Sequence, residues 1–241
     1  RGKDKAHAVS LVRRALELGV NFIDTAHSYG TEEAVGEGIK GVPRDDVVIS
    51  TKYHPAWDGK IHSNETIIAG LNESLERLNL EYVDIFHLHG VHPRYYGYVM
   101  EDVVPALMEE QDKGKFRYLG ITELATVDPG HEVLMRAADE GIFDVFMVAF
   151  HLMHQTARRA LFPITQDRGI GTLIMFAVRT LFSEPGRLKR DVDELVASGQ
   201  LPSTLQGASN PLEFLLHPDG ADSVIDACYR YARHTDGADV V

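Results

Sequence analysis

Four side chains whose types suit the reduction of a carbonyl group lie near the predicted ends of strands: Asp24, Tyr29, Lys52 and His89. Hydride transfer to a carbonyl leaves an alkoxide that must receive a proton, which a tyrosine hydroxyl can supply. A tyrosine with its ordinary pKa of about 10 is a reluctant acid near neutral pH. A nearby lysine ammonium lowers that pKa by stabilising the phenolate, and an aspartate keeps the lysine charged. A histidine ring can then orient the carbonyl oxygen. Each residue taken singly is also typical of a cap, a turn or a solvated strand end.

The elements that must position these side chains are short apolar runs that alternate with longer segments of helical periodicity. Strands are predicted at 20–25, 47–53, 82–89, 116–122, 143–149, 171–177 and 239–241. Helices are predicted at 4–19, 31–40, 63–79, 99–114, 128–141, 156–168 and 221–234. Strand runs such as "VVIS" and "DVFMVAF" are apolar on both faces, which is typical of parallel strands covered by helices.

The first six predicted strands begin 27, 35, 34, 27 and 28 residues apart, a spacing that fits repeated βα units. No G-x-G-x-x-G sequence follows the first strand, which argues against a Rossmann fold. We therefore predict an α/β fold of the (β/α)8 TIM barrel class, with residues 1–241 as one domain. In such a barrel, functional groups gather at the carboxyl ends of the strands. The polar stretch 178–210 predicts a long loop with a short helix, suited to act as a lid.

Composition indicates which partners the chain can have. With 24 Lys and Arg against 36 Asp and Glu residues, the net charge is −12, which disfavours nucleic acid and anionic membranes as main partners. No apolar run approaches the roughly 20 residues that span a bilayer. Cys228 is the lone cysteine, so no intrachain disulfide can form, and we predict a reducing, cytoplasmic location. The oligomeric state is not visible in the sequence.

Four segments together carry a resemblance to a known family: "GVNFIDTAHSYG", "VVISTK", "RLNLEYVDIFHLHG" and "RYLGITE". As an ordered set they resemble the aldo-keto reductases, from about residue 8 to residue 175 and again over the final helix and strand. The resemblance implies Tyr29 as general acid, Asp24 and Lys52 as the pair that tunes it, and His89 as the residue that orients the substrate. It implies a small-molecule carbonyl substrate, an aldehyde, ketone or sugar, that is reduced to an alcohol.

The same resemblance implies a nicotinamide cofactor, generally NADPH, bound without a Rossmann fold. Thr122 and Glu123 would lie by the nicotinamide carboxamide, and Met147 occupies the place of a glutamine that many members use there. Met175 and Phe176 lie around the position of a ring that stacks on the nicotinamide. The sequence lacks the family's opening strand and the C-terminal segment that holds the adenosine 2′-phosphate, so NADH stays an alternative.

Two further residues are candidates on their own chemistry. Arg179 opens the 178–210 loop and could meet a cofactor phosphate or lie at the surface. Trp57 could form an apolar wall of the substrate pocket or a packing contact.

Two other functions stay open at this point. His87 and His89 form an H-x-H at a strand end, which could bind zinc in a hydrolytic barrel with His27, His54 or His92. That interpretation leaves Tyr29 and Lys52 without a role. The second alternative is a catalytically weak, reductase-like regulatory subunit, against which measurable turnover would argue.

Overall fold

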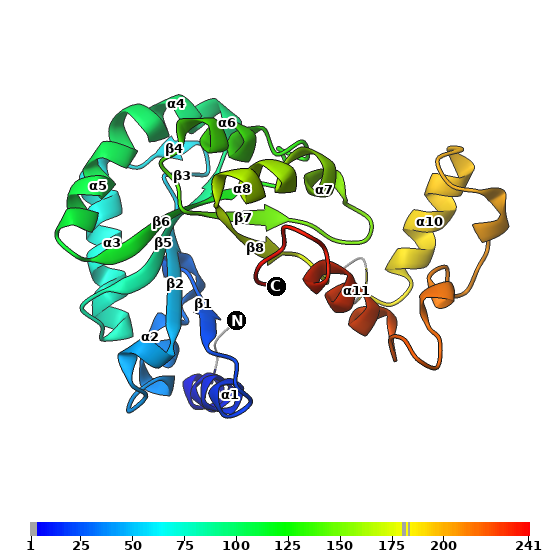
Figure 1. The fold of residues 1–241 in the computed structure, drawn as a ribbon, viewed down its shortest axis with the longest axis horizontal. Coiled ribbons are helices and arrows are strands. Elements are labelled where there is room, and N and C mark those ends of the chain that lie inside the picture. Colours follow the sequence, from blue (N-terminus) through cyan, green and yellow to red (C-terminus); the bar gives the residue numbers. More distant parts are fainter. Residues whose placement is uncertain (1–3, 180–181, 183) are drawn as a thin grey trace. The chain divides into compact units, whose positions relative to one another are not determined.

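A computed structural model describes residues 4–179, 182 and 184–241 of the chain (Figure 1). The chain divides into two compact units. Unit 1 comprises Arg1–Met147 and Arg168–Gly171, and unit 2 comprises Val148–Asp167 and Thr172–Val241. Each unit is described by itself.

Unit 1 is built on parallel strands that follow one another with helices between them. The strands are β1 (Phe22–Asp24), β2 (Val48–Tyr53), β5 (Val83–Val91), β6 (Phe116–Glu123) and β7 (Val145–Ala149, whose last two residues belong to unit 2), hydrogen-bonded in that order. Buried β-branched and aromatic residues dominate them, as expected of strands that are covered on one face and packed on the other. A two-stranded antiparallel hairpin, β3 (Ala56–Trp57) and β4 (Lys60–Ile61), extends from the end of β2.

The register of these strands determines which side chains share a face. Lys52 pairs with His87, and His87 pairs with Gly120, so these three positions lie side by side across β2, β5 and β6. Because side chains alternate along a strand, Lys52 and His87 project to one face, which we call the inner face. Residues at odd steps from them, such as Thr51, project to the opposite face, where the Thr51 hydroxyl donates to Glu32 of helix α2 at 2.7 Å.

Helices of unit 1 cover the outer face of the strands. They are α1 (Lys5–Glu17), α2 (Glu32–Gly38), α3 (Asn64–Leu78), α4 (Tyr96–Tyr98), α5 (Val104–Asp112) and α6 (Glu132–Glu140), with one π-helical segment at Val99–Val103. α3 contacts β2, and α5 and α6 contact β6 (Figure 1). α3 begins where the Ser63 hydroxyl accepts a hydrogen bond from the Thr66 backbone N–H, and it ends at Asn79 in the left-handed conformation.

Unit 2 contains α7 (Thr156–Ala160), α8 (Phe162–Arg168, whose last residue belongs to unit 1), α10 (Arg187–Ala197) and α11 (Val224–Arg233). Its strand β8 (Gly171–Met175) follows the end of β7 in the sheet order, where the Phe150 N–H donates to the Met175 carbonyl. The Ile174 N–H donates to the Val240 carbonyl at 2.7 Å. α10 lies inside the stretch 178–210 that we predicted to be a loop with a short helix. Residues 180, 181 and 183 of that stretch lie outside the described residues, and its role as a lid stays a prediction.

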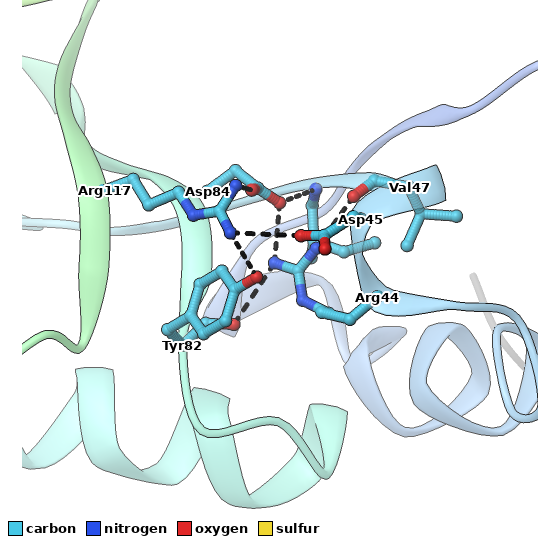
Figure 2. Close-up of polar contacts among 7 residues, drawn as sticks. Arg44, Asp45, Val47, Tyr82, Asp84 and Arg117 are labelled. Atoms are coloured by element: carbon cyan, nitrogen blue, oxygen red, sulfur yellow. Dashed lines mark hydrogen bonds and ion pairs between the residues drawn. The ribbon is translucent and has the colours of Figure 1, made fainter.

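The amino-terminal ends of β2, β5 and β6 are joined by a polar cluster centred on Asp84 (Figure 2). The Asp84 carboxylate accepts from the Arg44 guanidinium at 2.6 Å and from the Ile49 N–H at 2.8 Å, and it lies 3.3 Å from the Arg117 guanidinium. Both guanidiniums also lie over the Tyr82 ring, at 4.3 and 4.5 Å from its centre. We call Arg44, Tyr82, Asp84 and Arg117 the amino-end cluster. Its ion pairs and hydrogen bonds connect the adjacent strands β2, β5 and β6.

The predicted α/β fold of the TIM barrel class is confirmed in its pattern of parallel strands and intervening helices. The observed strands begin and end within about two residues of the predicted ones. The exception is the terminal strand at 239–241, which is reduced to a single bridge between Val240 and Leu173. The β3–β4 hairpin was not predicted. Among the described residues, no helix is both long enough and apolar enough to cross a membrane.

Candidate active site

Lys52 and Asp24 form the charged centre of the site. Asp24 is the last residue of β1 and Lys52 lies one strand away on the inner face of β2. The Lys52 ammonium donates to the Asp24 carboxylate at 2.5 Å and to the Thr25 carbonyl at 2.5 Å. The Ser50 hydroxyl donates to the other oxygen of Asp24 at 2.7 Å, so the carboxylate is fixed from two sides.

Tyr29 and His89 lie next to this pair. Tyr29 ends the short 3-10 helix His27–Tyr29 that follows β1, and Gly30 in the left-handed conformation reverses the chain behind it. The Lys52 ammonium lies 5.2 Å from the centre of the Tyr29 ring. The Tyr29 and His89 rings meet edge to face, with centres 5.6 Å apart. The structure therefore brings the four predicted residues Asp24, Tyr29, Lys52 and His89 into one cluster.

Burial sets the charge states in this cluster. The Lys52 side chain is fully buried, which lowers the pKa of its ammonium, while Asp24 acts in the opposite direction by favouring the charged form. Burial lowers the pKa of His89 to about 2, with further contributions from the neighbouring His54 and Lys52. His89 is therefore neutral at physiological pH, and a neutral imidazole can donate one hydrogen bond to a carbonyl oxygen. Strongly shifted groups gathered around one cluster are typical of functional sites.

His54 is a member of the cluster that the sequence analysis considered only as a zinc ligand. Its ring stacks on His89 with centres 3.9 Å apart, and its Nδ1 donates to the His89 carbonyl at 2.9 Å. That hydrogen bond places the proton of the neutral ring on Nδ1. Burial lowers the pKa of His54 to about 4, so the stacked pair does not carry two positive charges near neutral pH. Strand alternation was the available signal, because His54 follows Lys52 by two residues.

A pocket of about 330 Å³ opens beside this cluster. Its lining residues are His54, Pro55, Ala56, Trp57, Asp58, Gly59, Gly90, His92, Arg94, Tyr95 and Leu124. Trp57, in the β3–β4 hairpin, is 60% exposed and its ring centre lies 4.4 Å from that of His54. An exposed indole on a pocket wall is better suited to contact a ligand than to pack in a core.

Thr122 and Met147 are paired across β6 and β7, and they project to the inner face. The Thr122 hydroxyl accepts from the Gly90 N–H at 2.6 Å, which leaves its own proton available to a ligand. Glu123 projects to the outer face instead. Its carboxylate lies 2.7 Å from Nδ1 of His131, and both side chains are fully buried. A contact between Glu123 and a cofactor would therefore have to come from its backbone.

The remaining cofactor candidates, Met175, Phe176 and Arg179, lie in unit 2. Phe176 follows β8 with a positive φ of 73°, a strained conformation for a residue with a large side chain. The Arg179 guanidinium lies over the Phe176 ring at 3.9 Å from its centre. This unit thus holds an aromatic ring and a cation against each other, just after the end of β8.

The described residues include no group of three or more His, Cys, Asp or Glu residues arranged to hold a metal ion. His87 and His89 both project to the inner face, as strand alternation predicts, but His87 is fully buried and lies against Lys52 and Gly120. The zinc hydrolase alternative therefore finds no ligand set in this part of the chain.

The geometry of the site can be set beside known proteins. A sequence model of the aldo/keto reductase family matches residues 1–241. The chain is similar to L-galactose dehydrogenase of Arabidopsis thaliana, with 36% identity over 172 residues, which cover 69% of this chain and 53% of that protein. It is similar to an NADH-specific methylglyoxal reductase of Escherichia coli, with 27% identity over 69% of this chain and 55% of that protein. The aligned part is thus about half the length of these two relatives.

Solved structures agree with this result. An aldo-keto reductase of Bacillus halodurans in its holo form is 27% identical, with a TM-score of 0.60, and the match covers 73% of this chain and 58% of that one. An aldo/keto reductase of Klebsiella pneumoniae in complex with NADP and acetate is 26% identical, also with a TM-score of 0.60, over 83% and 69%.

Proposed function

Since the chain belongs to the aldo/keto reductase family, we propose that it reduces an aldehyde, ketone or sugar carbonyl with a nicotinamide cofactor, and that Tyr29 is the general acid. The observation that carries the proposal is the Lys52 ammonium, held by Asp24 and Thr25 and directed toward the Tyr29 ring. A buried cation beside a phenol favours loss of the phenol proton. Tyr29 can therefore protonate the alkoxide that hydride transfer creates.

His89 orients the substrate in this proposal. Its neutral imidazole lies at the edge of the Tyr29 ring, so a carbonyl oxygen between the two can receive hydrogen bonds from both. The stacked His54 and the exposed Trp57 form the wall along which the rest of the substrate lies.

The residues also suit a nicotinamide cofactor, which supplies the hydride when bound. In unit 1, Thr122 offers a hydroxyl proton to the carboxamide beside Met147, and Glu123 keeps its carboxylate on His131. Met175, Phe176 and Arg179 belong to unit 2, and they stay cofactor candidates on the family resemblance and on their residue types alone. Solved relatives bound to NADP support NADPH as the cofactor of this chain, with NADH as the alternative to be tested. We also propose a cytoplasmic location, consistent with the single, buried Cys228.

The test is an assay of nicotinamide absorbance with an aromatic aldehyde and NADPH, repeated with NADH, on the parent protein and on Tyr29→Phe. We expect the parent to turn over and Tyr29→Phe to lose a factor of about 10² to 10⁴ in kcat while it still binds cofactor. Tyr229→Phe, which removes a hydroxyl from an exposed tyrosine of α11, is the matched control and should keep the parental rate.

Equal rates for the parent and Tyr29→Phe would remove Tyr29 from the role of acid. Cofactor binding without turnover of any carbonyl tested would favour the regulatory subunit over the enzyme.

A further inference from the structure

His87 has no role in the reaction proposed above, yet it lies next to Lys52 in the sheet. It pairs with Lys52 on one side and with Gly120 on the other, and its side chain is fully buried. His89 follows it by two residues on the same strand and projects to the same face.

Two features of His87 are costly for the fold. Within the described residues, neither of its ring nitrogens has a hydrogen-bond partner. A buried polar atom without a partner costs about 1–3 kcal/mol, so an apolar side chain of similar size would make a more stable core. The ring also requires glycine beside it, because a Cβ on Gly120 would lie 2.1 Å from His87 Nδ1. A histidine retained at such a cost suggests a benefit other than stability.

The benefit follows from what surrounds the Lys52 ammonium. Asp24 and the Thr25 carbonyl are its hydrogen-bond partners, and burial works against its charge. Burial and the Lys52 charge both hold the pKa of His87 well below its usual value, so the imidazole stays neutral. A neutral imidazole is strongly dipolar. Beside Lys52 in the register of the sheet, this dipole can stabilise an ammonium through space, without a hydrogen bond, which an apolar side chain would not do.

We propose that His87 is a positioning residue that keeps Lys52 charged and directed toward Tyr29. The inference rests on the roles proposed above for Lys52 and Tyr29. Within the described part of the chain, the charged or titratable groups that face His87 are Lys52 on β2 and His89 on its own strand. Asp24 of β1 contacts Lys52, and the β6 residue paired with His87 is Gly120. His87 therefore acts on Tyr29 through Lys52.

The experiment measures Tyr29 ionisation directly, without turnover. Tyrosinate absorbance is titrated from pH 7 to 12 in the parent, His87→Leu and His87→Gln. Each is paired with the same protein carrying Tyr29→Phe, so that the difference isolates one tyrosine. We expect the Tyr29 midpoint to rise by about one pH unit in His87→Leu, because a less stabilised ammonium stabilises the phenolate less. His87→Gln keeps a polar side chain and should restore most of the parental midpoint.

A kinetic arm separates this inference from the proposed function. If the parent turns over, His87→Leu should lower kcat about tenfold with KM little changed, and His87→Gln should recover part of the loss. If the parent does not turn over, the reductase proposal fails, while the Tyr29 titration still decides the role of His87.

Thermal unfolding supplies the remaining control. His87→Leu should melt at or above the parental Tm, because it removes two unpartnered nitrogens from the core. A lower Tm together with an unchanged Tyr29 midpoint would show a packing role and overturn the proposal. If His87→Leu does not fold, His87→Met takes its place under the same criteria.

Discussion

At the amino-terminal end of β5, Asp84 accepts hydrogen bonds from Arg44 and from the Ile49 N–H, and Arg117 lies within ion-pair distance. At the carboxyl-terminal half of the same strand, His87 is fully buried and His89 is partly buried. Among the described residues, both ring nitrogens of His87 and Nδ1 of His89 lack hydrogen-bond partners. One end of the strand thus satisfies its charged group, and the other holds buried polar atoms without hydrogen-bond partners in the described part of the chain. The difference is consistent with our proposal that the carboxyl end carries out the chemistry, and it leads us to expect that the amino-end cluster serves stability.

The largest effect should come from Lys52→Met. We expect kcat to fall by a factor of about 10² to 10⁴, because the proposed acid Tyr29 loses the cation that favours release of its proton. The free energy of unfolding should change by less than about 1 kcal/mol, or rise, because methionine avoids the cost of burying an ammonium. The Asp24 carboxylate that loses its partner is about one-third exposed and keeps the Ser50 hydroxyl, so it is not left as a buried, unpaired charge. Steady-state assay and urea unfolding of the same preparation measure both. A large loss of stability with the rate unchanged would reverse the roles assigned to the two ends.

Asp84→Ala tests the opposite end. Removal of this carboxylate takes away the buried anion that pairs with two arginines, and it leaves the Ile49 N–H without its side-chain acceptor. We expect a loss of about 3 kcal/mol in unfolding free energy. Activity per folded molecule should stay within about twofold of the parent, because the cluster is at the far end of the strand from Tyr29. A kcat reduced by tenfold or more in fully folded protein would show that the two ends are coupled.

A change of pH should act on the histidines of the candidate site, so it tests the carboxyl end without a mutation. The pKa of His54 is lowered to about 4 and that of His89 to about 2, whereas an unfolded histidine titrates near 6.5. Below pH 6.5 the histidines of the unfolded chain therefore bind protons that those of the native site do not bind. The free energy of unfolding falls as pH falls from 6.5 toward 4.

One such proton changes stability by at most about 1.4 kcal/mol per pH unit, and less for a half-buried ring. His54→Gln should reduce the loss of unfolding free energy between pH 7.5 and 5.5 by roughly 1 kcal/mol. Denaturant melts at the two pH values provide the measurement. An identical pH dependence in parent and variant would show that His54 is not held neutral by the fold.

The smallest effect is expected from Arg117→Ala. Its side chain is about half exposed, its ion pair with Asp84 spans 3.3 Å, and it covers one side of the Tyr82 ring. We expect only a small loss of unfolding free energy, because water screens an ion pair whose arginine is half exposed. Arg44→Ala is the matched comparison and should cost more, because Arg44 is better buried and also donates to the Val47 carbonyl at 2.8 Å. Equal losses of unfolding free energy would mean that the two arginines contribute equally despite their different burial.

The sequence predicted the parallel strands well, but it did not predict the short hairpin that follows β2. β2 and β6 were predicted to within one residue at each end, because polar, turn-forming residues precede their β-branched and aromatic residues. The β3–β4 hairpin was missed because strands of two residues have no periodicity to detect.

The site shows the same contrast. Asp24, Lys52 and His89 were located because parallel strand ends converge, a rule that needs only the order of elements. The outward direction of Glu123 could have been read from its alternation with Thr122. Its partner His131 could not, because that contact depends on a left-handed backbone conformation at the start of α6.

The close approach of Gly120 and His87 limits which substitutions this site can accept during evolution. A side chain at 120 would collide with the His87 ring, so neither position can vary freely while the other stays as it is. A mutational path to a larger residue at 120 must first pass through a smaller residue at 87. Where relatives of this chain carry a bulky residue at the position of Gly120, we expect no histidine at that of His87, and an aligned collection of family members would reveal the two columns as a correlated pair.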